Sequence, residues 1–135
     1  MADLVSVAAS VVKYTGARTA TGIAGETIVA GQALYLSGSP AVLMKASDVS
    51  AAAAACVGIA LNGGAVNQPI TYLISGGINL GCAVAVGIPY GATDTAGGIG
   101  AISERATADY LTILGIATTT SRIEVNIRQG GVAVA

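Results

Sequence analysis

The sequence predicts an all-β protein, and three observations support that prediction. Short apolar segments recur along the chain between clusters of Gly, Asn, Ser and Pro, a pattern typical of a small β-sandwich or barrel. Residues 122–128, RIEVNIR, alternate polar and apolar side chains without interruption, as a half-buried strand does. The 19 glycines are about twice the usual proportion and suit many tight turns.

Each predicted strand is a short apolar segment bounded by turn residues. In chain order the predicted strands are Leu4–Val7, Ala33–Leu36, Ala41–Lys45, Cys56–Leu61, Ile70–Ile74, Ala83–Val86, Ile99–Ile102, Leu111–Thr118 and Arg122–Arg128. In the last of these, the period of two places Ile123, Val125 and Ile127 on the core side.

The alanine run in AAAAACVGIALNGG, residues 51–64, is the one helix candidate. Alanine is the best helix former, but six or seven residues alone make a marginal helix. Val57, Gly58 and Ile59 follow at once and favour a strand. We therefore expect Ala51–Ala55 to be a connector with at most one short helix.

The chain carries an internal echo. Val57-Gly58-Ile59-Ala60 returns as Leu114-Gly115-Ile116-Ala117, and Gly115 follows Gly58 by 57 residues (115 − 58). A loosely matching stretch precedes each copy, residues 30–35 with Gly31 ahead of the first and residues 86–90 with Gly87 ahead of the second. We predict two similar β units, about 25–77 and 80–131, in a single domain over 25–135. An extended N-terminal arm, 1–24, precedes them and has no strong pattern of its own.

The composition predicts a protein that works through contact surfaces. Hydrophobic residues make up 53% of the chain and charged residues 10%, against about 25% charged in soluble domains. So few charges leave apolar patches on a monomer, and such patches usually mark an interface. We expect a homo-oligomer or a subunit docked on something larger. The six basic residues are scattered, which argues against nucleic-acid binding.

A membrane span is not expected, because no window offers the roughly 20 consecutive apolar residues that a spanning helix needs. No secretory signal is visible at Met1-Ala2-Asp3-Leu4.

The residues offer little chemistry. There is no His, and none of the seven carboxylates pairs with another in a local motif, so we expect no enzyme, no cofactor and no metal site. Cys56 and Cys82 are read as small buried apolar side chains, with a disulfide possible only if the fold brings them together. Five tyrosines are the only aromatic residues. Tyr35 and Tyr90 stand in similar places in the two units, which indicates a packing or interface role.

Ten short motifs of small residues extend over nearly the whole chain: TGIAGETI (21–28), AGQALYL (30–36), KASD (45–48), VGIAL (57–61), QPITY (68–72), SGG (75–77), VGIPY (86–90), AGGI (96–99), LGIA (114–117) and GVAVA (131–135). Taken together, these motifs resemble the small head decoration (capsid cement) proteins of phages and prophages.

The resemblance implies a structural virion protein, made in the host cytoplasm, that binds the outer surface of a phage capsid and stabilises the mature shell by bridging capsid subunits. Its implied partner is the major capsid protein, and its implied state is a homo-oligomer, with a trimer favoured and a dimer as the alternative. Lys13, Tyr14 and Arg18 of the arm are the candidate capsid contacts. The alternative is a tail, fibre or carbohydrate-binding β module of a virion; the absence of Trp argues against a carbohydrate binder.

Overall fold

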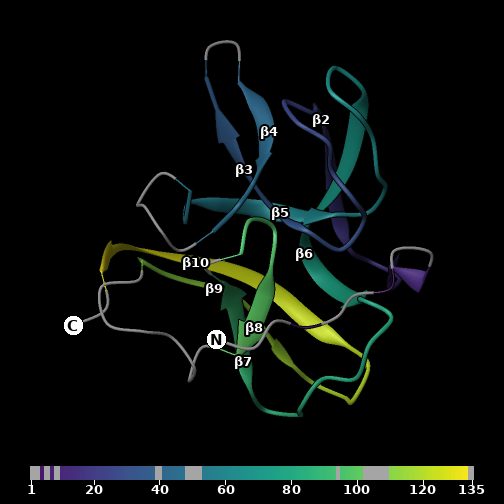
Figure 1. Ribbon diagram of the computed structural model, residues 1–135. Helices are drawn as coiled ribbons and strands as arrows, with labels where there is room; N and C mark the ends of the chain where they lie inside the picture. Colours follow the sequence, from purple (N-terminus) through teal and green to yellow (C-terminus); the bar gives the residue numbers. More distant parts are fainter. Residues whose placement is uncertain are drawn as a thin grey trace.

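The computed structural model describes residues 4, 7, 10–38, 41–47, 53–93, 95–101 and 110–133. The predicted all-β fold is confirmed: within those residues, ten strands form one antiparallel sheet that curls into a half-barrel (Figure 1). The strands are β1 (Val12–Lys13), β2 (Arg18–Ile23), β3 (Ala33–Ser37), β4 (Val42–Lys45), β5 (Cys56–Ala60), β6 (Pro69–Asn79), β7 (Pro89–Ala92), β8 (Ile99–Ala101), β9 (Tyr110–Ala117) and β10 (Ile123–Ala133).

The strand order repeats one pattern twice. The sheet runs β4-β3-β5-β6 and then, in mirror order, β10-β9-β7-β8. On each side a hairpin (β3–β4, β7–β8) pairs through its first strand with the next strand (β5, β9), which pairs with the last one (β6, β10). The two sides meet where β6 pairs with β10, and Ser75 lies opposite Asn126.

The register also repeats. Leu34 pairs with Gly58 and Tyr90 pairs with Gly115, and in both places the register shifts at the next residue. The preceding turns match as well, because Gly31 and Gly87 both have positive φ, 93° and 81°. The amide of Gly31 donates to the Ala60 carbonyl, and that of Gly87 to the Ala117 carbonyl, each at 2.8 Å. We call a residue of one side equivalent to a residue of the other side when the two occupy the same position in the matching strand pairs.

The two glycines of the echoed motif have one physical cause. A Cβ on Gly58 would collide with the Leu73 carbonyl, and a Cβ on Gly115 with the Glu124 carbonyl. Leu73 and Glu124 are themselves equivalent, since they lie opposite Ile59 and Ile116. The close strand approach beside the register shift therefore requires Gly at both positions.

Strand β6 belongs to both sides. Ser75 pairs with Arg18 of β2 and with Asn126 of β10, so these two strands flank opposite edges of β6. β2 pairs with the first part of β6, and the last part of β6 pairs with β10. In the repeat, β2 therefore corresponds to the last part of β6, and the first part of β6 corresponds to β10. We therefore define the first half as β2 to β5 with residues 69–75, and the second half as residues 75–79 with β7 to β10. Figure 1 shows the first half above the second, with β6 running between them.

The first half closes on itself. Ala24 forms an isolated parallel bridge with Leu43, and the amide of Gly25 donates to the Leu43 carbonyl at 2.9 Å. Glu26 accepts a 2.9 Å hydrogen bond from the Lys45 amide and lies 3.7 Å from the Lys45 ammonium. These contacts join β2 to the edge strand β4. They enclose a small core of Ala24, Ile28, Leu34, Leu43, Ala60, Ile70 and Tyr72.

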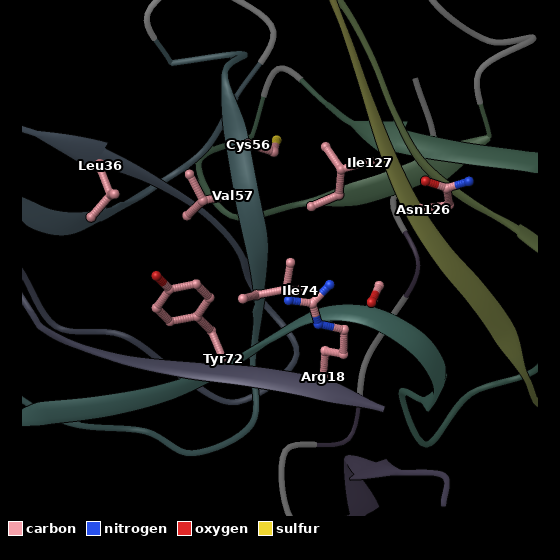
Figure 2. Close-up of a pocket in the computed structure, with 9 residues that line it drawn as sticks. Arg18, Leu36, Cys56, Val57, Tyr72, Ile74, Asn126 and Ile127 are labelled. Atoms are coloured by element: carbon pink, nitrogen blue, oxygen red, sulfur yellow. The ribbon is translucent and has the colours of Figure 1, made fainter. Parts of the chain in front are cut away.

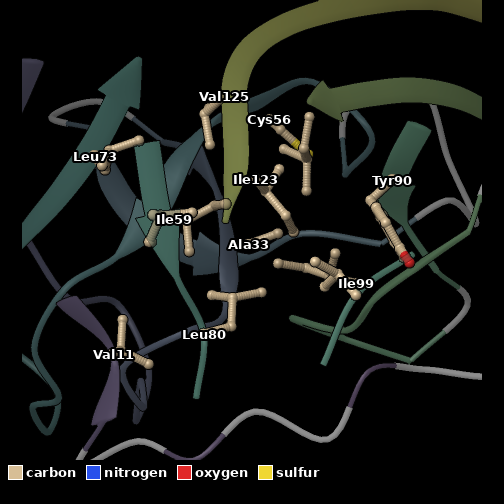
Figure 3. Close-up of a cluster of buried hydrophobic side chains, with 14 of the residues drawn as sticks. Val11, Ala33, Cys56, Ile59, Leu73, Leu80, Tyr90, Ile99, Ile123 and Val125 are labelled. Carbon is tan, nitrogen blue, oxygen red and sulfur yellow. The ribbon is translucent and has the colours of Figure 1, made fainter. Parts of the chain in front are cut away.

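The inner face of the second half packs against the outer face of the first half. The inward side chains of the second half share one core cluster with residues from the outer face of the first half (Figure 3). The second half contributes Tyr90, Ala92, Leu114, Ile123 and Val125 to this cluster, and the first half contributes Ala33, Cys56, Ile59 and Leu73. The main core therefore lies between the halves.

Several predicted boundaries need correction. Ala83–Val86 is not a strand: it is irregular up to Ala85 and enters a turn at Val86. The Val84 amide donates to the Thr120 carbonyl and makes no ladder with a neighbouring strand. The strands at 18–23 and 89–92 were not predicted, since they carry Gly, Pro and Thr in place of apolar alternation. β1 and β2 both fall within the predicted arm and pair with β6.

The remaining elements follow the sequence more closely. Ala53 and Ala54 form a turn that leads into β5. Ala51, Ala52 and most of the predicted strand Leu4–Val7 lie outside the described residues.

Candidate functional site

The functional features that stand out among the described residues are surfaces. In that part of the chain, no three His, Cys, Asp or Glu residues gather closely enough to hold a metal ion. Among the described residues, no helix is long and apolar enough to cross a membrane. Two hollowed surfaces are the candidate contact features of the described part of the chain.

The first surface is the open end of the first half, which we call the mouth. It is a groove of about 870 Å³ between β2, β3, β5, β6 and β10 (Figure 2). Its exposed lining is polar and apolar in about equal parts, and among the described residues that line it Arg18 alone carries a charge. The lining residues are Arg18, Leu36, Cys56, Val57, Tyr72, Ile74, Ser75, Asn126 and Ile127.

Strand alternation explains why apolar side chains line part of the mouth. Leu34 points into the small core and is fully buried, and Leu36, two residues later on the same face, reaches the open end and is 45% exposed. Ile74 stands in the same relation to Tyr72 on β6. The mouth is thus the uncovered continuation of the core of the first half.

The second surface is the outer face of β9 and β10, which we call the wall. It frames a hollow of about 540 Å³ lined by Ile113, Gly115, Ile116, Thr118, Glu124 and Asn126. Ile116 is 48% exposed, although it belongs to the same Gly-Ile-Ala motif as the fully buried Ile59. Glu124 is the charged residue among those that line the wall.

A cluster around Tyr14 fixes the N-terminal segment to the sheet. The Arg122 guanidinium lies 4.6 Å from the centre of the Tyr14 ring and also pairs with the Glu124 carboxylate. The Tyr14 amide donates to the Gly77 carbonyl at 2.9 Å. Gly77 also makes room for Arg122, because a Cβ there would collide with the guanidinium.

The three predicted capsid contacts are not gathered into one site. Lys13 is exposed on β1, opposite Ile78, and Arg18 is exposed at the mouth. Tyr14 is half-buried and engaged by Arg122, so it anchors the segment.

The predicted match between Tyr35 and Tyr90 is wrong by one residue. Tyr90 is equivalent to Leu34, since both lie opposite the motif glycines. A shift of one residue along a strand moves a side chain to the other face. Tyr90 is 4% exposed in the main core, and its hydroxyl accepts a 2.9 Å hydrogen bond from the Ala85 amide. Tyr35 is half-buried on the opposite face of its strand.

The two cysteines do not form a disulfide with each other. Cys56 is buried in the main core and Cys82 is half-buried beside it. Burial raises the pKa of the Cys82 thiol, which favours the unreactive protonated form. Both therefore fit the predicted role of small apolar side chains.

Sequence reasoning missed three residues that shape these surfaces. Leu36 and Ile116 look like ordinary core positions of apolar segments, and Arg122 looks like a solvated strand end. The one available signal was the echo itself, because a motif present twice leaves open whether both copies are covered.

Comparison with known proteins adds no family to this picture: no model of a known protein family matches the chain, and no curated protein matches it significantly.

Proposed function

We propose that this protein is a structural virion protein that binds the outer surface of a phage capsid and stabilises the mature shell by bridging capsid subunits. The observation that carries the proposal is an exposed apolar surface on a β scaffold with few charges. Among the residues that the structure describes, eight large apolar side chains are between 43% and 59% exposed, and two of them, Leu36 and Ile116, lie at the mouth and the wall. Such surfaces usually serve contact with other proteins.

The motifs quoted above add support, since they resemble decoration proteins over nearly the whole chain. In this proposal the partner is the major capsid protein, and the chain acts as a homo-oligomer, a trimer rather than a dimer. Several subunits that dock together hold tightly, because each bound subunit raises the effective concentration of the next contact.

The capsid contacts in this proposal include the N-terminal segment, where Lys13 is an exposed charged side chain on β1. Tyr14 holds that segment on the sheet through Arg122, so Lys13 is presented from a fixed strand. Lys13→Glu reverses the charge without removing a packed group. We expect weaker capsid binding by co-sedimentation and an unchanged melting temperature.

The decisive test is cryo-electron microscopy of phage particles from a host that carries this gene, with mass spectrometry of the same particles. Many copies on the outside of the shell are expected. Absence from the head would overturn the proposal, and a few copies at the tail would favour the tail or fibre alternative.

A further inference from the structure

The mouth and the wall are the two sides of a contact that the chain already makes once. In the first half, the wall positions Ala33, Cys56, Ile59 and Leu73 are 0%, 1%, 0% and 0% exposed, because the second half covers them. Their equivalents in the second half are Pro89, Ile113, Ile116 and Glu124. None of these four is buried.

The converse holds for the mouth. In the second half the mouth positions Ala92, Leu114, Ile123 and Val125 are at most 2% exposed, since the outer face of the first half fills them. Their equivalents in the first half are Leu36, Val57, Tyr72 and Ile74, which line the open groove. The duplication thus leaves one mouth and one wall without a partner.

We propose that the wall of one copy of this chain docks in the mouth of another copy. The occupant is a second copy because the second half shows that a mouth of this kind accepts a wall of this kind. Ile113 and Ile116 replace Cys56 and Ile59 at the contact, so the exposed wall keeps an apolar centre. Leu36, Val57 and Ile74 supply the apolar lining that receives it.

The charges at the two surfaces are complementary. Arg18 is the charged residue of the mouth and Glu124 that of the wall. Leu73, the equivalent of Glu124 in the contact inside the chain, is apolar. Glu124 also pairs with Arg122, which directly precedes β10, and the Glu124 side chain remains 41% exposed. A cation in the mouth and a carboxylate on the wall favour this docking over mouth-to-mouth contact, where two Arg18 side chains would repel.

The irregularity in β10 and the start of β2 fit a contact between two copies. Inside the chain the two halves are connected by the continuous strand β6. Between two copies no strand continues across the contact. β10 of one copy must therefore leave the regular pairing at the contact, and β2 of the other copy must begin there. β10 shifts its register between Val125 and Arg128, and β2 begins at Arg18 just after Gly16, which has φ of 87°.

This contact is head-to-tail, because the two copies use different surfaces. Head-to-tail contacts build closed rings or open chains and cannot build a two-fold dimer. The mouth and the wall are therefore the contact surfaces of the proposed homo-oligomer, and their head-to-tail contact favours a closed trimer over a two-fold dimer. This contact rests on self-association alone and does not depend on the capsid.

Complementation between two variants tests the proposal. Ile116→Asp spoils the wall and leaves the mouth intact, and Leu36→Asp does the reverse. Sedimentation velocity of the full chain would follow the wild type, each variant and their equimolar mixture. The wild type is expected to assemble, and each variant to associate at least about tenfold more weakly. The mixture is expected to form a 1:1 complex and nothing larger, since one good wall meets one good mouth.

Val66→Asp is the matched control, because Val66 is 53% exposed in the β5–β6 loop and lines neither surface. It should assemble like the wild type. Circular dichroism checks folding, and Ile116→Lys with Leu36→Lys replaces any aspartate variant that does not fold.

A monomeric wild type, undiminished assembly of both variants, or a mixture that stays monomeric would each overturn the inference. A monomer found on capsids would leave the capsid proposal standing. An assembling chain absent from virions would leave this inference standing.

Discussion

The two halves of this protein have the same strand pairing but different cores. The first half is closed by β2 and β4 and encloses its own small cluster of side chains. The second half has no such closure, and its inward side chains pack against the outer face of the first half. The difference shows that equal local patterns do not give equal burial. Burial depends on what the rest of the chain brings against each face.

The largest expected effect comes from a matched pair of substitutions, one in each half. Ile59 and Ile116 are equivalent, and the first is fully buried between the halves while the second is 48% exposed. Ile59→Ala should lower the free energy of unfolding by about 2–5 kcal/mol, because it opens a cavity in the main core. Ile116→Ala should change it by about 0.5 kcal/mol or less in dilute protein. Urea denaturation measures both, and equal losses would contradict the difference in burial.

The second prediction concerns what the halves share. Gly58→Ala and Gly115→Ala should each destabilise the fold by about 1–3 kcal/mol, because each new methyl group meets a backbone carbonyl that cannot move aside cheaply. Thermal unfolding of the two variants, beside the exposed-loop variant Val66→Ala, measures the effect. A neutral result at either glycine would show that the close strand approach is absent in that half.

The third prediction tests the closure that only the first half has. Glu26→Ala removes the acceptor of the Lys45 amide and should cost about 1–2 kcal/mol. The Lys45 amide should also exchange its hydrogen faster, since it then lacks its partner. Glu26→Gln keeps an acceptor oxygen and serves as the control. Unchanged exchange in Glu26→Ala would mean that another contact holds β2 against β4.

The smallest expected effect concerns the attachment of the N-terminal segment to the second half. Arg122→Met keeps a long apolar side chain but removes the charge that lies over Tyr14 and pairs with Glu124. We expect a loss of about 0.5–1 kcal/mol, because the contact is partly exposed to solvent. Chemical denaturation with Lys13→Met as the control measures it. A loss in the control as large as that in Arg122→Met would argue against a specific role for the ring contact.

Much of the fold could be predicted from the sequence where the side chains alternate. β3, β4, β5 and β9 were placed to within about one residue at each end, and β10 at its start, because apolar segments and flanking turn residues mark them locally. β2 was missed, since Arg18–Ile23 is built from Thr, Ala and Gly and gains its strand conformation by pairing with β6. β7 was missed because Pro89 begins it and Gly91 lies within it.

The candidate surfaces were less predictable than the strands. The composition indicated exposed apolar surface, but it did not say which side chains form it. Tyr35 and Tyr90 were matched because the letters agree, and the one-residue offset appears only in the strand register. Arg18 was singled out for its charge, but its place in the mouth depends on β2, β3 and β6 coming together.

By itself the sequence determined the β class, most strand positions and the two glycines that a close strand approach requires. These features are local, because alternation and glycine act through near neighbours in the chain or across one strand pair. Only the tertiary structure decided that Ile59 is covered and Ile116 is not, and that β6 serves both halves. The physical reason is that burial is set by packing between segments far apart in the chain. Two copies of one motif have the same local sequence but different packing partners.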